Sequence, residues 1–549
     1  MKYALLFAVL SGYQPEPADT VLVNGRVVTL EPRGVVEAIA VRGDRIVATG
    51  TNAEVDAFAG PRTRRVDLGG KTVAPGFADN HYHGIGGGPG VDLSRTRNLQ
   101  EVIDAIARRA RETPPGELVV TNSDWHEGQL REQRLPFRDD LDRATSEHPV
   151  VVVRGGHEVI LNSAALSKWK IDESTPSPDG GRVGRYPDGR LNGELVDSAK
   201  RLAELPRNES SDAESRLRDM AAELHRLNEA GLTSARFASG SPELYRAVET
   251  LKERGLLTIR VSMLLRIDPA QDPNELETTL DRFGLRPDEG DDWLRVSGIK
   301  LGVDGGFEGG WMREPYEEPY GGGGEFRGLQ TFATETYIEI VRRLNRRGWR
   351  VATHAVGDAA IDLVLDAYER ANEDQSIVGR RFTIEHGFIP REDQFPRIRA
   401  LGVHLSAQHH LYLAAPSLEK YWGGSRARWV TPLRAYLDAG IPVSLGTDSP
   451  VAPYHPLGVL YHFVTRDTLS AGTMGEDQRI SREEALRAMS LGNAALDFSE
   501  DERGSLAPGK LADLVVLSRD ILTCGAREIL GTEVKLTMVG GRFVFEESP

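Results

Sequence analysis

The sequence predicts an α/β protein whose central domain is a (β/α)8 barrel, the TIM-barrel fold, with a small β-sandwich domain built from both termini and a large insertion after the first barrel strand. Three observations indicate this architecture. Eight short apolar runs alternate with helical patterns through the middle of the chain. Both ends alternate apolar and polar residues between glycine turns, and a long gap separates the first apolar run from the second.

The eight runs have the length and composition of buried parallel strands, and a count of eight, with helices between most of them, is that of the barrel. The helical pattern over 334–348 places Ile338, Val341 and Leu344 on one face. We therefore assign residues 73–83 and 207–500 to the barrel. The runs cover residues 73–79, 232–238, 257–264, 294–302, 349–357, 381–387, 402–407 and 441–448.

The two ends of the chain are expected to form one domain. Residues 19–72 alternate in period two around turns such as Asn24-Gly25, and residues 501–549 show the same pattern around a Gly-Gly turn. Between the first and second barrel strands, residues 84–206 contain strands of their own and a Pro/Gly/Asp-rich run. Because active sites form in the loops after barrel strands, we expect this insertion to cover the barrel mouth.

The composition limits the function. The chain has 549 residues and a formal charge of −15, which argues against a nucleic-acid partner because phosphate backbones require a basic surface. The single cysteine, Cys524, permits no intramolecular disulfide and no cysteine-based zinc site. Any metal must therefore be held by histidine, carboxylate or modified side chains.

Residues 1–18 have the pattern of an export leader and linker. One lysine and a short apolar run precede Leu10-Ser11-Gly12, which resembles the lipobox of bacterial lipoproteins except that Tyr13 replaces the lipid-bearing cysteine. This pattern predicts a periplasmic, cell-envelope or secreted protein, with a cytoplasmic location as the alternative. No segment is long and apolar enough for a stable membrane span.

Polar side chains stand where the predicted barrel strands end. The carboxyl ends of all strands meet on one face of a barrel, so residues far apart in sequence converge there. Histidines at i and i+2 of a strand point the same way and can share a metal. The candidates are His81, His83, Lys300, His354, His386 and Asp448. Tyr82, between the first two histidines, is expected to point into the barrel wall.

These motifs resemble the metal-dependent amidohydrolase superfamily. PGFADNHYHG is similar to the family's PGFIDxHxH opening, and the Lys, His, His, Asp order of GIKLGVDGG, VATHAVGDAAID, FTIEHG and IPVSLGTDSPV follows it. Within the superfamily the chain resembles amidohydrolase family 3, the relatives of N-substituted formamide deformylase. The resemblance runs from about residue 19 to 545.

The resemblance implies a metal site and a reaction. His81 and His83 with Asp448 would hold one metal, and His354 and His386 a second. Lys300, carboxylated by CO2 to a carbamate, would bridge them. Zn2+ is expected, as one or two ions, with other divalent metals as alternatives. A metal-activated hydroxide, with Asp448 as general acid and base, would hydrolyse a non-peptide C–N bond in an amide, formamide or cyclic amide of a small molecule.

Two other readings stay open. One is an isomerase or lyase with the same fold, and the other is a non-catalytic envelope binding protein. A homodimer is one assembly that such enzymes form. The residues expected to contact substrate are Trp125, His157, Gln408 and His410, with Arg426 as a candidate carboxylate ligand. The GGFEGG loop after Asp304 departs from the family's more usual serine-containing loop.

Overall fold

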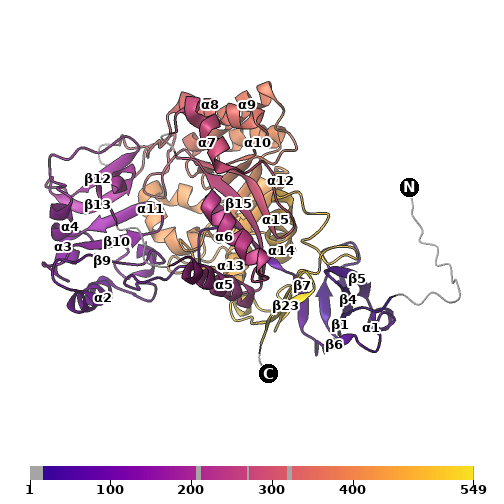
Figure 1. Cartoon of the computed structure of the whole chain (residues 1–549). Helices are drawn as coiled ribbons and strands as arrows, with labels where there is room; N and C mark the ends of the chain where they lie inside the picture. The colour runs from indigo at the N-terminus through magenta and orange to yellow at the C-terminus, as the bar shows by residue number, and fades with distance from the viewer. Residues whose placement is uncertain (1–15, 206–211, 269–270, 318–323, 548–549) are drawn as a thin grey trace.

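The computed structural model describes residues 16–205, 212–268, 271–317 and 324–547 (Figure 1). Residues 1–15 of the predicted leader lie outside this range, so the leader stays a prediction. Among the described helices, none is both long enough and apolar enough to cross a membrane.

An eight-stranded parallel sheet forms the centre of the molecule and confirms the predicted barrel. Each of the eight predicted runs contributes a strand to this sheet, and the strands are hydrogen-bonded to one another in chain order. The strands are β8 (Phe77–Tyr82), β14 (Leu232–Gly240), β15 (Arg260–Arg266), β16 (Leu294–Gly302), β17 (Val351–Ala355), β18 (Thr383–His386), β19 (His404–Gln408) and β20 (Val443–Gly446). Their side chains are almost all buried, which explains why the sequence reads as apolar runs rather than as alternation.

The barrel closes where β8 meets the chain that leaves β20. The backbone N–H of His83 donates to the carbonyl of Ser449 (2.9 Å), and the N–H of Asp448 donates to the carbonyl of His81 (2.8 Å). The carboxylate of Asp79 accepts the N–H of Thr447 (3.0 Å). The seam is therefore held at its carboxyl end by residues of the two predicted metal-binding motifs.

Helices surround this sheet. The predicted helix over 334–348 is α8 (Thr334–Arg346), whose Val341 and Leu344 are fully buried against the barrel core. The others are α5 (Ala213–Glu229), α6 (Pro242–Glu253), α7 (Leu276–Phe283), α9 (Asp358–Asp374), α10 (Phe395–Leu401), α11 (Leu411–Arg428), α12 (Leu433–Asp438), α13 (Pro456–Thr465), α14 (Arg482–Met489) and α15 (Leu491–Leu496).

Both ends of the chain build the β-sandwich, seen beside the barrel in Figure 1. One sheet has the order β5-β4-β1-β6 and the other β23-β22-β21-β7-β2-β3, and apolar residues of both share one core. The first comprises β1 (Thr20–Val23), β4 (Ala38–Arg42), β5 (Arg45–Gly50) and β6 (Arg64–Asp67); the second comprises β2 (Arg26–Val28), β3 (Val35–Val36), β7 (Thr72–Pro75), β21 (Leu514–Leu517), β22 (Val534–Val539) and β23 (Arg542–Glu546).

The predicted barrel segment 73–83 is wrong at its start. Strand β7 pairs with β2 and β21 and so belongs to the sandwich, and only β8 enters the barrel. Gly76 separates them. A Cβ atom at this position would lie 2.2 Å from the Thr233 side chain, so only glycine fits where the chain crosses from one domain to the other.

An ion pair ties the sandwich to the bottom of the barrel. The guanidinium of Arg260, at the start of β15, donates to both carboxylate oxygens of Asp513 (2.7 and 3.0 Å). Asp513 also accepts the N–H of Gly540 (2.8 Å). Both side chains of the pair are buried, so this contact fixes the two domains relative to each other.

The segment between β8 and β14 contains a mixed five-stranded sheet with the order β12-β13-β11-β10-β9. Figure 1 shows it on the opposite side of the barrel from the sandwich, next to α11. Its strands are β9 (Val119–Val120), β10 (Val150–Arg154), β11 (Glu158–Leu161), β12 (Gly181–Arg185) and β13 (Leu191–Asp197), and its helices are α2 (Leu99–Glu112), α3 (Arg138–Asp142) and α4 (Ser163–Lys168).

Buried ion pairs connect this insertion to the barrel. Arg154 of β10 binds Glu127 (2.7 Å) within the insertion and Glu308 (2.9 Å) in the loop that follows β16. The hydroxyl of Ser417 in α11 donates to Glu127 (3.0 Å). Because these groups are withdrawn from water, each depends on its partners, and the insertion is held firmly over the barrel mouth.

Candidate metal centre and active site

A cavity of about 870 Å³ opens at the carboxyl ends of the barrel strands, between the barrel and the insertion. The barrel side contributes residues from the ends of β8, β15, β16, β17 and β18, and the insertion contributes residues that follow β10 and β13. This is the position at which barrel enzymes bind their substrates.

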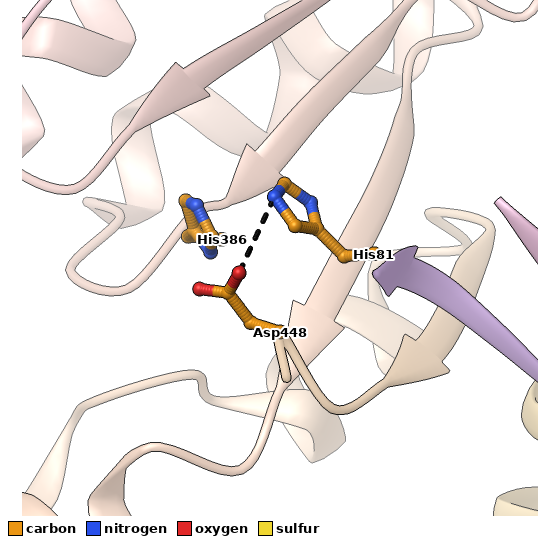
Figure 2. A group of neighbouring side chains, drawn as sticks. All are labelled: His81, His386 and Asp448. Atoms are coloured by element: carbon orange, nitrogen blue, oxygen red, sulfur yellow. Dashed lines mark ion pairs between the residues drawn. The ribbon is translucent and has the colours of Figure 1, made fainter. Parts of the chain in front are cut away.

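All six predicted metal ligands line this cavity. The tightest group is His81, His386 and Asp448, in which one ligand atom of each residue lies within 4.8 Å of those of the other two (Figure 2). Asp448 has a φ of 58° and His386 a φ of 72°, so both adopt the left-handed conformation as the chain leaves β20 and β18. Such backbone strain is typical of functional sites.

The other three residues adjoin this group. Nε2 of His83 lies 3.2 Å from Oδ1 of Asp448. Nζ of Lys300 lies 3.2 Å from Nε2 of His81. The ring of His354 packs against that of His386, with 4.6 Å between their centroids. The barrel thus brings together side chains from five of its eight strands.

The protonation states suit a cation. Burial lowers the pKa of His81 to about 4 and holds that of His386 well below its usual value, so both are neutral imidazoles near pH 7. Burial acts to raise the pKa of Asp448, but the neighbouring His81 and hydrogen bonds from His410 and His83 outweigh it and leave the pKa well below its usual value. Two neutral imidazoles and a carboxylate are suitable ligands for a divalent metal.

Buried partners orient two of these histidines. Nδ1 of His81 lies 2.6 Å from Oε2 of Glu385, and Nδ1 of His386 lies 2.6 Å from Oε1 of Gln408. Arg236 pairs with the other oxygen of Glu385. Because each Nδ1 is occupied, Nε2 is the nitrogen left to bind a metal, which is how many metal sites fix their histidine ligands.

A model of the amidohydrolase family matches residues 64–545. The chain belongs to the amidohydrolase family. An N-substituted formamide deformylase from Arthrobacter pascens is 30% identical over 96% of this chain and 99% of the relative. A metal-dependent hydrolase structure from Pyrococcus furiosus is 26% identical with a TM-score of 0.65, and covers 92% of this chain and 100% of its own. A second, from Pyrococcus horikoshii, has a TM-score of 0.68 at 24% identity, covers 92% and 99% of the two chains, and shows the fold alone.

This membership makes the protein an amidohydrolase-family hydrolase that acts on small molecules. The family is metal-dependent, and the His81, His386 and Asp448 group has the donors that such a metal needs. The predicted family and fold are therefore confirmed.

Four of the amidohydrolase's supporting residues were not predicted. Glu385 and Arg236 form the ion pair behind His81. Asp79 accepts the N–H of His81 (3.0 Å), and burial raises its pKa to about 6. Asp304 accepts the N–H groups of residues 311, 356 and 357, and burial raises its pKa to about 7. The signal for Glu385 was present, because an acid inside the apolar strand RFTIEHG requires a partner.

The predicted substrate residues divide into two groups. His157 and His410 line the cavity of this amidohydrolase. Nδ1 of His157 lies 2.6 Å from Oδ1 of Asp197, and its ring stacks on His354 at 5.1 Å. Nε2 of His410 lies 3.0 Å from Oδ2 of Asp448. Both side chains can therefore reach a bound substrate.

Trp125, Gln408 and Arg426, the other residues considered for substrate contact, are not among the residues that line the cavity. Trp125 is 3% exposed, packs in the core of the insertion and donates its indole N–H to the carbonyl of Val153 (2.8 Å). Gln408 supports His386 from behind. Arg426 donates to backbone carbonyls, among them that of Pro315 (2.8 Å).

Two smaller expectations can also be compared with the structure. Tyr82 points into the barrel wall, where its ring packs against Phe237 (5.3 Å between centroids) and its hydroxyl donates to Glu223 (2.5 Å). In the GGFEGG loop, Phe307 lines the cavity and Glu308 binds Arg154 of the insertion. The loop therefore supplies an apolar wall and an anchor for the insertion.

Proposed function

We propose that this amidohydrolase cleaves a non-peptide C–N bond of a small amide, formamide or cyclic amide. The observation that carries the proposal is the group of His81, His386 and Asp448 at the base of the cavity, with its histidines neutral and its aspartate ionised. The substrate class is supported by the similarity to a formamide deformylase over nearly the whole of both chains.

A divalent metal such as Zn2+, when bound, would supply Lewis acidity and lower the pKa of water to about 7. We propose that His81, His83 and Asp448 hold one ion and His354 and His386 a second. The contact from His83 to Asp448 (3.2 Å) supports the first site, and the packing of the His354 and His386 rings (4.6 Å between centroids) supports the second. Because His386 also lies close to His81 and Asp448, the two proposed sites would adjoin each other.

Lys300 is proposed to act as a carbamate. Burial, together with nearby Arg236 and Arg266, lowers the pKa of its ammonium to about 8. A larger fraction of this lysine is therefore neutral at pH 7 than of an ordinary lysine, and the neutral amine is the form that adds CO2. The product is an anion, which removes the repulsion that an ammonium beside Nε2 of His81 would exert on a metal.

Asp448 is proposed to move the proton. One carboxylate oxygen lies 3.2 Å from His83 and the other 3.0 Å from His410, so the group is held toward the cavity. It takes a proton from the attacking water as the hydroxyl adds to the scissile carbonyl carbon. It then returns that proton to the nitrogen as the C–N bond breaks, which gives a carboxylic acid and an amine.

The test combines metal content with turnover. Elemental analysis of the purified protein is expected to find zinc or another divalent metal, and a panel of formamides, acetamides and cyclic amides is expected to include a substrate. The variant Asp448→Asn should lose turnover by a factor of at least about 100, the range that general acid–base groups contribute. The exposed Asp366→Asn, whose residue pairs with Arg397 on the surface, is the control.

The alternatives give different results on the same panel. An isomerase or lyase would change a substrate without incorporating oxygen from labelled water. A non-catalytic binding protein would hold metal and turn nothing over. For the carbamate, Lys300→Ala activity partly restored by short carboxylic acids would support the proposal, whereas metal content and rate equal to those of the wild type would contradict it.

Export and assembly are separate proposals. N-terminal sequencing of the mature protein from cell fractions would test the leader and the periplasmic or envelope location. Light scattering of the purified protein would test the homodimer.

A further inference from the structure

Two cationic side chains in the wall of the active-site cavity form no ion pair with any carboxylate in the part of the chain that the structure describes. Arg266 ends β15 and is the register partner of Lys300 on β16. Lys200 belongs to the insertion, in the 3-10 helix Ser198–Leu202 that follows β13. Both line the cavity, one from the barrel and one from the insertion.

The other arginines of the cavity wall are paired. Arg154 binds Glu127 and Glu308, and Arg201 binds Asp268 (3.4 Å). Arg266 makes no hydrogen bond or ion pair with any part of the chain that the structure describes, and its side chain is exposed to the cavity. Among the described residues, Lys200 donates to the backbone carbonyl of Gly156 alone.

The two cations face the same cavity, one from the barrel and one from the insertion. Burial lowers the pKa of Lys200, the charges of Asp197 and Glu308 oppose that change, and the charge of Arg266 adds to it. Like charges that share a site repel each other, and an anion placed between them relieves that repulsion.

The carboxylates nearby do not fill this role. Oδ1 of Asp197 is bound to His157 at 2.6 Å, and Asp197 forms no ion pair with Lys200. Asp179 also lines the cavity, but within the described ranges it forms no ion pair with Arg266 or Lys200. Within the described ranges, neither cation is therefore neutralised by a direct ion pair with a carboxylate of the protein.

We propose that Arg266 and Lys200 form an anion subsite, and that the substrate is an amide bearing a carboxylate away from the bond that is cleaved. The inference rests on the proposed hydrolase function and narrows its substrate class. A guanidinium matches a carboxylate through two parallel hydrogen bonds, and an ammonium adds a point charge. Since one cation comes from each domain, the substrate would span the junction of barrel and insertion.

The apolar part of the cavity suits the rest of such a molecule. Phe307, Phe388 and Val451 line the same space as the two cations. An N-formyl or N-acyl amino acid with an apolar side chain has the three features required: a scissile amide, a carboxylate and an apolar group.

The test compares two formamides that differ only in the carboxylate, N-formylphenylalanine and N-(2-phenylethyl)formamide. For each, kcat/KM is measured with the wild type, Arg266→Gln and Lys200→Gln, and binding is measured in parallel by calorimetry. The matched control is Arg201→Gln, which removes a paired arginine from the same cavity wall.

The wild type is expected to prefer the carboxylate compound. Arg266→Gln should lower the kcat/KM of the carboxylate compound by about 10- to 100-fold more than that of the neutral compound, the loss expected for a hydrogen bond between charged groups. Lys200→Gln should have a smaller effect of the same kind, and Arg201→Gln none.

Three results would overturn the inference while leaving the hydrolase function intact. The first is an equal loss of kcat/KM for both compounds in Arg266→Gln, and the second is no loss for either compound. The third is inhibition by free acetate or phosphate that is as strong in Arg266→Gln as in the wild type. Hydrolysis of neither compound, nor of any other amide, would instead overturn the proposed function. The calorimetric affinities of the two compounds for the wild type and Arg266→Gln would then still decide whether the subsite exists.

Discussion

Replacing Glu385 by glutamine would test whether the ion pair behind the metal centre determines metal affinity. The Glu385 carboxylate is fully buried, with one oxygen 2.6 Å from Nδ1 of His81 and the other on Arg236. Glutamine keeps the shape but removes the charge. His81 then loses the acceptor that fixes its tautomer, and Arg236 keeps a buried positive charge without a counterion.

The magnitude follows from these two contacts. Partners of this kind typically change metal affinity by about 10- to 100-fold, which corresponds to about 1.4 to 2.8 kcal/mol. Breaking a buried ion pair by removing one partner costs about 3–5 kcal/mol. Because the glutamine oxygen can still accept a hydrogen bond from Arg236, we expect a loss of folding stability near the lower end of that range.

The assay is competition for zinc with a chelator of known affinity, alongside denaturant unfolding of the metal-free protein. The control is Glu369→Gln, which removes a similar contact to an arginine at the surface, the 2.7 Å pair with Arg397. This control should leave the metal affinity unchanged and lower the free energy of unfolding by at most about 1 kcal/mol. Metal affinity of Glu385→Gln within a factor of two of the wild type would refute the argument that this pair prepares His81.

Three further predictions concern the metal, the insertion and the domain junction. Removal of metal by a chelator should abolish turnover and lower the thermal midpoint, and zinc at 100 times its Kd should restore about 2.7 kcal/mol of stability. Trp125→Phe should lower the free energy of unfolding by about 1 kcal/mol, because the indole hydrogen bond is lost, and leave kcat/KM unchanged. Trp125→Ala should lower the free energy of unfolding by about 3–5 kcal/mol because it opens a cavity in the insertion. A changed KM in Trp125→Phe would instead indicate that Trp125 contacts the substrate. Asp513→Ala should lower the free energy of unfolding by about 3–5 kcal/mol because Arg260 loses its buried partner. The control is Glu546→Gln, which breaks the exposed pair with Arg64 and should lower the free energy of unfolding by at most about 1 kcal/mol. Equal unfolding free energies for these last two variants would contradict the role given to the junction.

The sequence was a sufficient guide to the barrel because its strands are buried on both faces. Such strands are uninterrupted apolar runs, and all eight were predicted at nearly their observed positions. The boundary at Gly76 was missed because β7 and β8 are both apolar and read as a single run. The two strands are separated at Gly76, which lies against Thr233. Because Thr233 is far from Gly76 in the chain, the local sequence pattern could not predict this contact.

The same reason explains which parts of the site could be predicted. The six ligand candidates stand at strand ends, and the barrel topology alone brings strand ends together. The partners behind them depend on pairings across the barrel, such as that of Arg236 with Glu385, 149 residues apart. The position of Trp125 could not be predicted because its partner, the carbonyl of Val153, belongs to a different strand of the insertion.

The seam between β8 and β20 has a consequence for the synthesis of the protein. His83 and Asp448 are 365 residues apart (448 − 83), and the seam that joins their strands is also where the metal ligands meet. At roughly 5–20 residues per second, the ribosome needs about 18–73 s to make the intervening chain. Throughout that interval β8 has no neighbour on one side, and its histidines lack their aspartate. The complete metal centre therefore cannot form until residue 448 has been made, and a chain that stops before residue 448 would have neither a closed barrel nor a complete metal centre.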